Sequence, residues 1–191
     1  MIILGVDGSL THTGLAVVET DEAGVRDRLL WSGTIVTKET DGDHVDRFIS
    51  ILRGVVGAAG KWSPDLIALE WPFVDPSKSA ATALMLGGLD WCLRVHLRLH
   101  EFRNVVTVAP ASRLAAVGIK SRGRHSAAIK ADTIALVLRA CEVAVNEHEA
   151  DAYAVAKAGL AKWRKAQRQA TQLSLDVRPG RRAAKRKGAL R

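Results

Sequence analysis

The sequence has few cysteines, few aromatic residues and no long apolar stretch. Its two cysteines among 191 residues, Cys92 and Cys141, form no C-x-x-C pair, so they indicate neither a disulfide framework nor a zinc site. We expect both to be reduced core residues. No apolar run approaches the ~20 residues of a membrane-spanning helix, and no basic-then-apolar leader opens the chain. We therefore expect a cytoplasmic protein without a membrane partner.

Two common phosphate-binding motifs are also missing. The first apolar run, I-I-L-G-V, is followed by D-G-S and then by another apolar run, whereas a Rossmann or P-loop unit would begin a helix there. The sequence contains neither G-x-G-x-x-G nor G-K-[ST] at this point. The opening pattern instead predicts a strand, a tight loop and a second strand.

Acidic residues are scarce at the C-terminal end. Residues 157–191 contain 12 Lys and Arg against one acid, a balance of +11, so the remaining chain carries about −3 of the total +8. This asymmetry points to a polyanionic partner, most simply a nucleic acid. We expect one domain over residues 1–172, followed by a basic, disordered tail over residues 173–191.

The hydrophobic pattern predicts an α/β domain. The first three strands follow one another directly, which indicates an antiparallel meander, with Ser32-Gly33 as a candidate bulge in the third strand at 28–37. A helix is expected over 42–61, ending near Gly60, and a second over 77–100. Further strands are expected at 66–69 and 104–109, and further helices at 111–117, at 126–140 and from residue 146.

Three of these elements each carry an acidic residue near one end. Asp7 ends the first strand, Glu70 ends the fourth, and Asp151 lies in the last helix with His148 and Glu147 on the same face. If strands one and four are adjacent and parallel, these acids meet, and a cluster of this kind suits Mg²⁺ or Mn²⁺. Two such ions would support phosphodiester hydrolysis. The alternative is that the acids only cap turns and helices and never meet.

Other residues suit nucleic-acid contacts. The loop G-I-K-S-R-G-R-H crowds Lys120, Arg122 and Arg124 together, which suits phosphate binding, although an ordinary solvated loop would look the same. Trp71 and Phe73 follow Glu70 closely and would either cover the core or stack on unpaired bases.

The motifs G-V-D-G-S, L-E-W-P-F and H-E-A-D-A-Y-A-V-A, in this order of elements, resemble the RuvC-type Holliday junction resolvases. The resemblance covers residues 2–160 and implies the RNase H-like fold, with a five-stranded mixed sheet of three antiparallel and then two parallel strands flanked by helices. It further implies a homodimer that cuts four-way or branched DNA using Mg²⁺, with two ions per site. The residues it assigns are the metal-binding Asp7, Glu70, His148 and Asp151, the stacking Phe73, and Lys130 of A-x-K near the scissile phosphate.

Departures from the family pattern leave specificity open. Asp7-Gly8-Ser9 replaces the usual D-P-G, and S-R-G-R-H-S replaces the glycine-rich run before A-x-K. Such divergence suits a phage-encoded member acting in the bacterial cytoplasm or nucleoid. An RNA-directed YqgF-type nuclease and a non-catalytic binding protein with a basic tail remain alternatives. The actin-like ATPases need a second lobe, for which 191 residues are too few.

Overall fold

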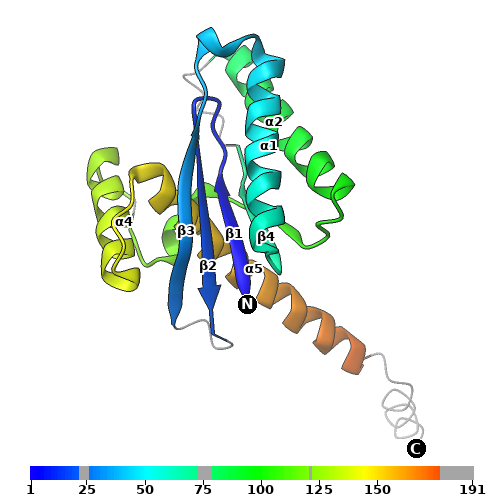
Figure 1. Cartoon of the computed structure of the whole chain (residues 1–191). Helices are drawn as coiled ribbons and strands as arrows, with labels where there is room; N and C mark the ends of the chain where they lie inside the picture. Colours follow the sequence, from blue (N-terminus) through cyan, green and yellow to red (C-terminus); the bar gives the residue numbers. More distant parts are fainter. Residues whose placement is uncertain (22–25, 73–78, 121, 177–191) are drawn as a thin grey trace, which may run out of the picture.

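The structure is a computed structural model that describes residues 1–21, 26–72, 79–120 and 122–176. Five strands, a short 3-10 helix and five α-helices alternate along these residues (Figure 1). Their bounds are β1 Ile2–Asp7, β2 His12–Thr20, β3 Asp27–Val36, η1 Glu39–Asp41, α1 His44–Trp62, β4 Leu66–Glu70, α2 Ala80–Leu99, β5 Val105–Val108, α3 Pro110–Ala116, α4 Ser126–Cys141 and α5 Glu147–Asp176.

The strands form one mixed sheet in the order β3-β2-β1-β4-β5. The first three are antiparallel, and β4 and β5 run parallel to β1. This arrangement confirms the predicted five-stranded sheet. Because β1 and β4 run side by side in the same direction, their carboxyl ends lie at one edge of the sheet.

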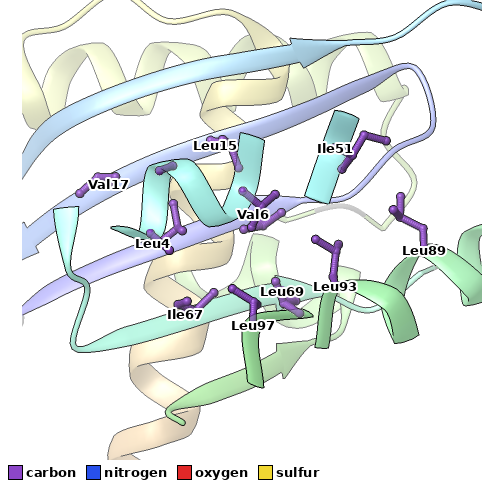
Figure 2. Packing of buried hydrophobic residues seen from close by; sticks show 13 residues of the cluster. Leu4, Val6, Leu15, Val17, Ile51, Ile67, Leu69, Leu89, Leu93 and Leu97 are labelled. Atoms are coloured by element: carbon purple, nitrogen blue, oxygen red, sulfur yellow. The ribbon is translucent and has the colours of Figure 1, made fainter. Parts of the chain in front are cut away.

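Helices cover both faces of the sheet and make two cores (Figure 1). On one face, α1 and α2 pack against Leu4, Val6 and Leu69 (Figure 2). On the other, α4 and α5 pack against Ile3 and Ala16. Successive residues of β1 thus point into opposite cores, as the two-residue period of a strand requires. Strands buried on both faces explain the continuous apolar runs in the sequence.

Two local predictions about chain geometry were wrong. The bulge lies at Leu30, because Val17 pairs with Trp31 while Val18 pairs with Leu29, and the pairing is regular at Ser32 and Gly33. Gly33 instead makes room for the Trp31 ring, which would lie 2.7 Å from a Cβ added there. The first helix likewise passes through Gly60 and ends at Ser63, whose φ of 44° is left-handed, immediately before Pro64.

The second helix, α2, turns one apolar face toward solvent. Leu84, Trp91, Val95 and Leu99 are 78%, 70%, 53% and 75% exposed, whereas Leu89, Leu93 and Leu97 form the buried face. Two apolar stripes compete on this helix, and periodicity alone does not say which one faces the sheet. Cys92 is also exposed, contrary to its prediction as a core residue, and Cys141 is half-buried.

The last helix extends four residues beyond the predicted boundary at 172 and reaches Asp176. Most of the basic tail, 177–191, lies outside the described residues. None of the helices in the described part of the chain is both long and apolar enough to cross a membrane.

Candidate active site

The pairing of β1 with β4 places Asp7 beside Glu70. Val6 is opposite Leu69 in the parallel register, so the next residue of each strand is one of the two acids. Both side chains are largely buried, at 14% and 13% exposed. The two carboxylates therefore meet at the carboxyl edge of the sheet, where parallel α/β sheets usually bind their ligands.

Asp151 reaches the same edge because α5 lies directly on the sheet. Gly5 and Gly14 form the contact, and a Cβ added to either would lie 2.0 Å from a backbone oxygen of α5, that of Ala152 or of His148. Only glycine permits this approach of helix to strand. The side chain of Asp151, one turn after His148, then points at the two strand-end acids.

An arginine lies among the three carboxylates. The Nη1 atom of Arg113 is 2.8 Å from Asp151 Oδ2 and 3.9 Å from Asp7 Oδ1, and its Nε is 3.3 Å from Glu70 Oε1. Arg113 comes from α3, which follows β5, and is 14% exposed. Sequence reasoning missed this residue. Its signal is a lone basic side chain in the short helix after a third parallel strand, and so at the same edge as Asp7 and Glu70.

Burial and crowding disfavour the ionised forms of these acids. The pKa of Glu70 is raised to about 9, first by burial and then by its hydrogen bond to Asp7 and the negative charge of that residue, which outweigh Arg113. Burial likewise raises the pKa of Asp151 against the opposing charge of Arg113. Three acids share one guanidinium, so the cluster retains a demand for positive charge.

The donor set suits a divalent cation, although the carboxylates surround Arg113 instead of a common point. Glu70 Oε1 and Arg113 Nε are both buried without a hydrogen bond to the described residues, despite their ion-pair distance. A buried carboxylate oxygen without a donor is costly, and a metal ion would satisfy it. Within residues 1–176, apart from the undescribed gaps, no three His, Cys, Asp or Glu side chains are already spaced to hold an ion.

His148 and Glu147 lie at the start of the same helix but face a different set of neighbours. The His148 ring stacks on His12, with centroids 5.0 Å apart, and its Nε2 is 3.4 Å from Glu147 Oε1. Glu147 also pairs with Lys130 Nζ at 2.9 Å, and the hydrogen bond from that lysine lowers the pKa of Glu147. Glu149 points away from these residues and accepts a hydrogen bond from Ser32. No motif or spacing in the sequence singles out His12.

The predicted nucleic-acid contacts divide into three groups. Lys120, Arg122 and Arg124 are all exposed, and Arg124 pairs with Asp132 at 2.7 Å. Lys130, one turn into α4, lies close to the acidic edge through its pair with Glu147. Phe73 lies outside the described residues.

A cleft of about 550 Å³ opens beside Glu70. The connection between β1 and β2 lines one side of it, and Trp71 and the first turns of α2 line the other. Trp71 is 55% exposed, with the Arg94 guanidinium 5.8 Å from its ring centre. Of the three clustered acids, Glu70 lines this cleft, so the cluster borders it on one side.

Comparison with known proteins accounts for this arrangement. Residues 3–159 match the family model of crossover junction endodeoxyribonuclease RuvC. The chain belongs to the RuvC family. Asp7, Glu70, Arg113 and Asp151 all lie inside the matched segment, so the RuvC resemblance found in the motifs is confirmed for the region that builds the site.

Individual RuvC proteins show the same relationship at moderate identity. The RuvC of Xanthomonas oryzae pv. oryzae (strain PXO99A) is 33% identical over 121 residues, which cover 61% of this chain and 64% of that protein. The chain thus matches slightly less than two thirds of the relative's length.

Solved structures share the fold. The Thermus thermophilus RuvC in complex with a Holliday junction superposes with a TM-score of 0.69 at 21% identity, covering 85% of this chain and 96% of the other. The yeast mitochondrial Holliday junction resolvase Ydc2 gives a TM-score of 0.53 at 12% identity, covering 87% of this chain and 83% of that chain. The likeness establishes the RuvC-type, RNase H-like architecture.

Proposed function

We propose that this RuvC-family chain is a metal-dependent, structure-selective endonuclease that cleaves four-way or branched DNA. The observation that carries the proposal is the convergence of Asp7, Glu70 and Asp151, from two strands and a distant helix, at one accessible edge of the sheet. Three acids that only capped turns would have no reason to meet. The RuvC match and the junction-bound structural neighbour point to the same substrate class.

The cluster would bind Mg²⁺, with Mn²⁺ as a substitute. Asp7, Glu70 and Asp151 would supply hard oxygen ligands, with His148 as the fourth ligand and two ions per site. When bound, the ions would supply an activated water and stabilisation of the leaving oxygen. The Oε1 atom of Glu70 supports this assignment, because it is buried and accepts no hydrogen bond from the described residues, although Arg113 Nε lies 3.3 Å away.

Basic residues near the cluster would hold the DNA backbone. Lys130 would contact the phosphate next to the cleaved bond, with Glu147 restraining the ammonium group until DNA arrives. Lys120, Arg122 and Arg124 would contact phosphates farther along the arm, and Phe73 would stack at the junction centre. The basic tail over 173–191 would add sequence-independent attraction to the domain over 1–172, whose setting would be the cytoplasm.

The exposed stripe on α2 supports a homodimer. Leu84, Trp91, Val95 and Leu99 lie on one helical face, and a Cβ added to Gly87 would meet nothing within 4 Å. An apolar face with a small residue at its centre allows close approach of a second helix, and such patches on soluble proteins usually mark interaction sites. Two copies would bring two acidic clusters to one junction, where they would make paired nicks on opposite strands.

The decisive test is cleavage of a labelled immobile four-way DNA junction by the Asp7→Asn variant. This change removes one metal ligand while keeping side-chain size, so we expect cleavage to fall by at least about a hundredfold with junction binding retained. Glu19→Gln is the matched control, because Glu19 lies at the opposite end of the sheet in an exposed pair with Arg28.

Four results would reject the proposal. One is full cleavage by Asp7→Asn, and another is wild-type cleavage that persists in EDTA. The third is cleavage of an RNA hairpin but not of the junction, which would instead support the YqgF-type alternative. Binding of the junction without nicking under any metal would favour a non-catalytic binding protein.

A further inference from the structure

We propose that Arg113 is the resident counter-ion of the carboxylate cluster and that it must leave before metal ions can bind there. The inference rests on the proposed metal site, and it concerns how that site exchanges its cations. Arg113 would thus gate metal binding, a role that the family match alone does not assign to this residue.

The first observation is position. Arg113 reaches all three acids at once, at 2.8, 3.3 and 3.9 Å. Those acids come from β1, β4 and α5, and their side chains converge on this one guanidinium. A metal ion bound by the same carboxylate oxygens would have to occupy the space that the guanidinium now fills, because both would need direct contact with the same oxygens. The two cations therefore exclude each other.

The second observation is that Arg113 is held unevenly. Only its contact with Asp151 has the distance of a strong charge-assisted hydrogen bond. Its Nε near Glu70 makes no hydrogen bond with good geometry among the described residues, and the approach to Asp7 is long. A permanent structural ion pair would satisfy its buried atoms, whereas this one leaves a buried donor and a buried acceptor facing each other unsatisfied.

The third observation is charge. One guanidinium carries a single positive charge, whereas three ionised carboxylates would carry three negative charges, which divalent ions would balance better. The arginine side chain has several rotatable bonds and extends from α3, whose buried Leu114 anchors the helix backbone. The guanidinium can therefore withdraw without moving α3. A DNA phosphate at the cleft would offer it a new partner, which would couple metal binding to DNA binding.

The test measures Mn²⁺ binding to the full chain without DNA, from the electron paramagnetic resonance signal of free Mn²⁺. Arg113→Gln removes the competing cation, so we expect it to bind Mn²⁺ about 10- to 100-fold more tightly than wild type, the range for one charge-assisted hydrogen bond. Arg113→Lys keeps the charge but cannot contact Glu70 and Asp151 through two nitrogens, and should fall between them. Arg28→Gln is the control, since it removes the same charge from an exposed pair.

A second readout covers the case in which the glutamine variant folds poorly. The melting temperature of metal-free Arg113→Gln should be lower than that of wild type, and saturating Mn²⁺ should raise it by more than it raises the wild-type value. Affinities that differ by less than twofold, or tighter binding by wild type, would overturn the proposal. So would Mn²⁺ binding by neither protein, which would make Arg113 a permanent partner. Mn²⁺ binding without junction cleavage would reject the proposed function alone and leave the counter-ion role standing.

Discussion

Replacing Gly14 by alanine should damage both the fold and the site. Gly14 lies in β2 directly opposite Asp7. A Cβ at this position would lie 2.0 Å from the carbonyl oxygen and 2.5 Å from the carbonyl carbon of His148. Both are backbone atoms of α5, so no side chain can rotate away to make room. The added methyl group must therefore push the helix off the sheet.

The size of the displacement follows from the contact. Ordinary van der Waals contact begins near 3.4 Å, so the helix must move by about 1.4 Å at its first turn. Ala152 packs closely on Gly5 in the same way, so lifting the helix also opens the packing at that second position. Overpacking of this kind costs about 1–3 kcal/mol, and two backbone contacts place Gly14→Ala at roughly 2–3 kcal/mol. Asp151 moves with the helix, and a misplacement of ~1 Å costs about a hundredfold in rate.

Urea and thermal denaturation measure the loss of stability, and junction cleavage measures the loss of rate. For a chain of this size, the expected loss of stability lowers the melting temperature by roughly 4–12 °C. Gly57→Ala is the matched control, since an added Cβ there meets nothing within 4 Å, and alanine inside α1 should stabilise by about 0.5–1 kcal/mol. If Gly14→Ala kept the wild-type stability to within about 0.5 kcal/mol and cleaved at the wild-type rate, the close approach of α5 to the sheet would be refuted.

Two further predictions concern α5 and α2. Tyr153→Phe removes the O–H that donates to Asp27 Oδ2 at 2.7 Å, so the free energy of unfolding by urea should fall by about 1–2 kcal/mol; an unchanged value would show that the bond contributes nothing. Trp91→Glu places a charge on the exposed stripe and should weaken dimerisation at least tenfold in sedimentation equilibrium, whereas Leu173→Glu, which alters an exposed apolar residue outside the stripe, should not. Equal dissociation constants for the two variants would remove α2 from the interface.

Much of the fold was predictable because buried strands and turns leave strong local signals. The apolar runs ending at Asp7 and Glu70 became adjacent parallel strands, and the predicted antiparallel meander was confirmed. The approach of Asp151 to these acids was predictable as well, because it required only that the last helix pack across the ends of these two strands. These predictions depend on the spacing of apolar residues and on the polarity of the residues between them, both of which are read directly from the sequence.

The predictions that were wrong and the features that were missed share a physical cause. Each depends on a contact between residues that lie far apart in the sequence or on separate elements. The exposed stripe of α2 differs from its buried stripe only in what lies opposite, and the sequence of one helix does not record that. The bulge lies at Leu30, and Gly33 instead leaves space for the Trp31 ring, a contact between side chain and backbone that the pattern of the strand does not show. Arg113 belongs to the site only because β5 runs parallel to β4 and delivers α3 to the same edge. Such pairings emerge from tertiary packing alone.

The position of Asp151 in the last helix has a consequence for synthesis. A growing chain emerges N-terminus first, so β1, β2 and β3 are available to pair long before α5 exists. α5 then contacts all five strands and, together with α4, covers one of the cores. A chain interrupted before residue 147 carries Asp7 and Glu70 but lacks Asp151 and exposes an uncovered sheet. Incomplete chains would therefore be open to proteolysis, and under the proposed function they could not yet cut DNA, because the third carboxylate of the site would be missing.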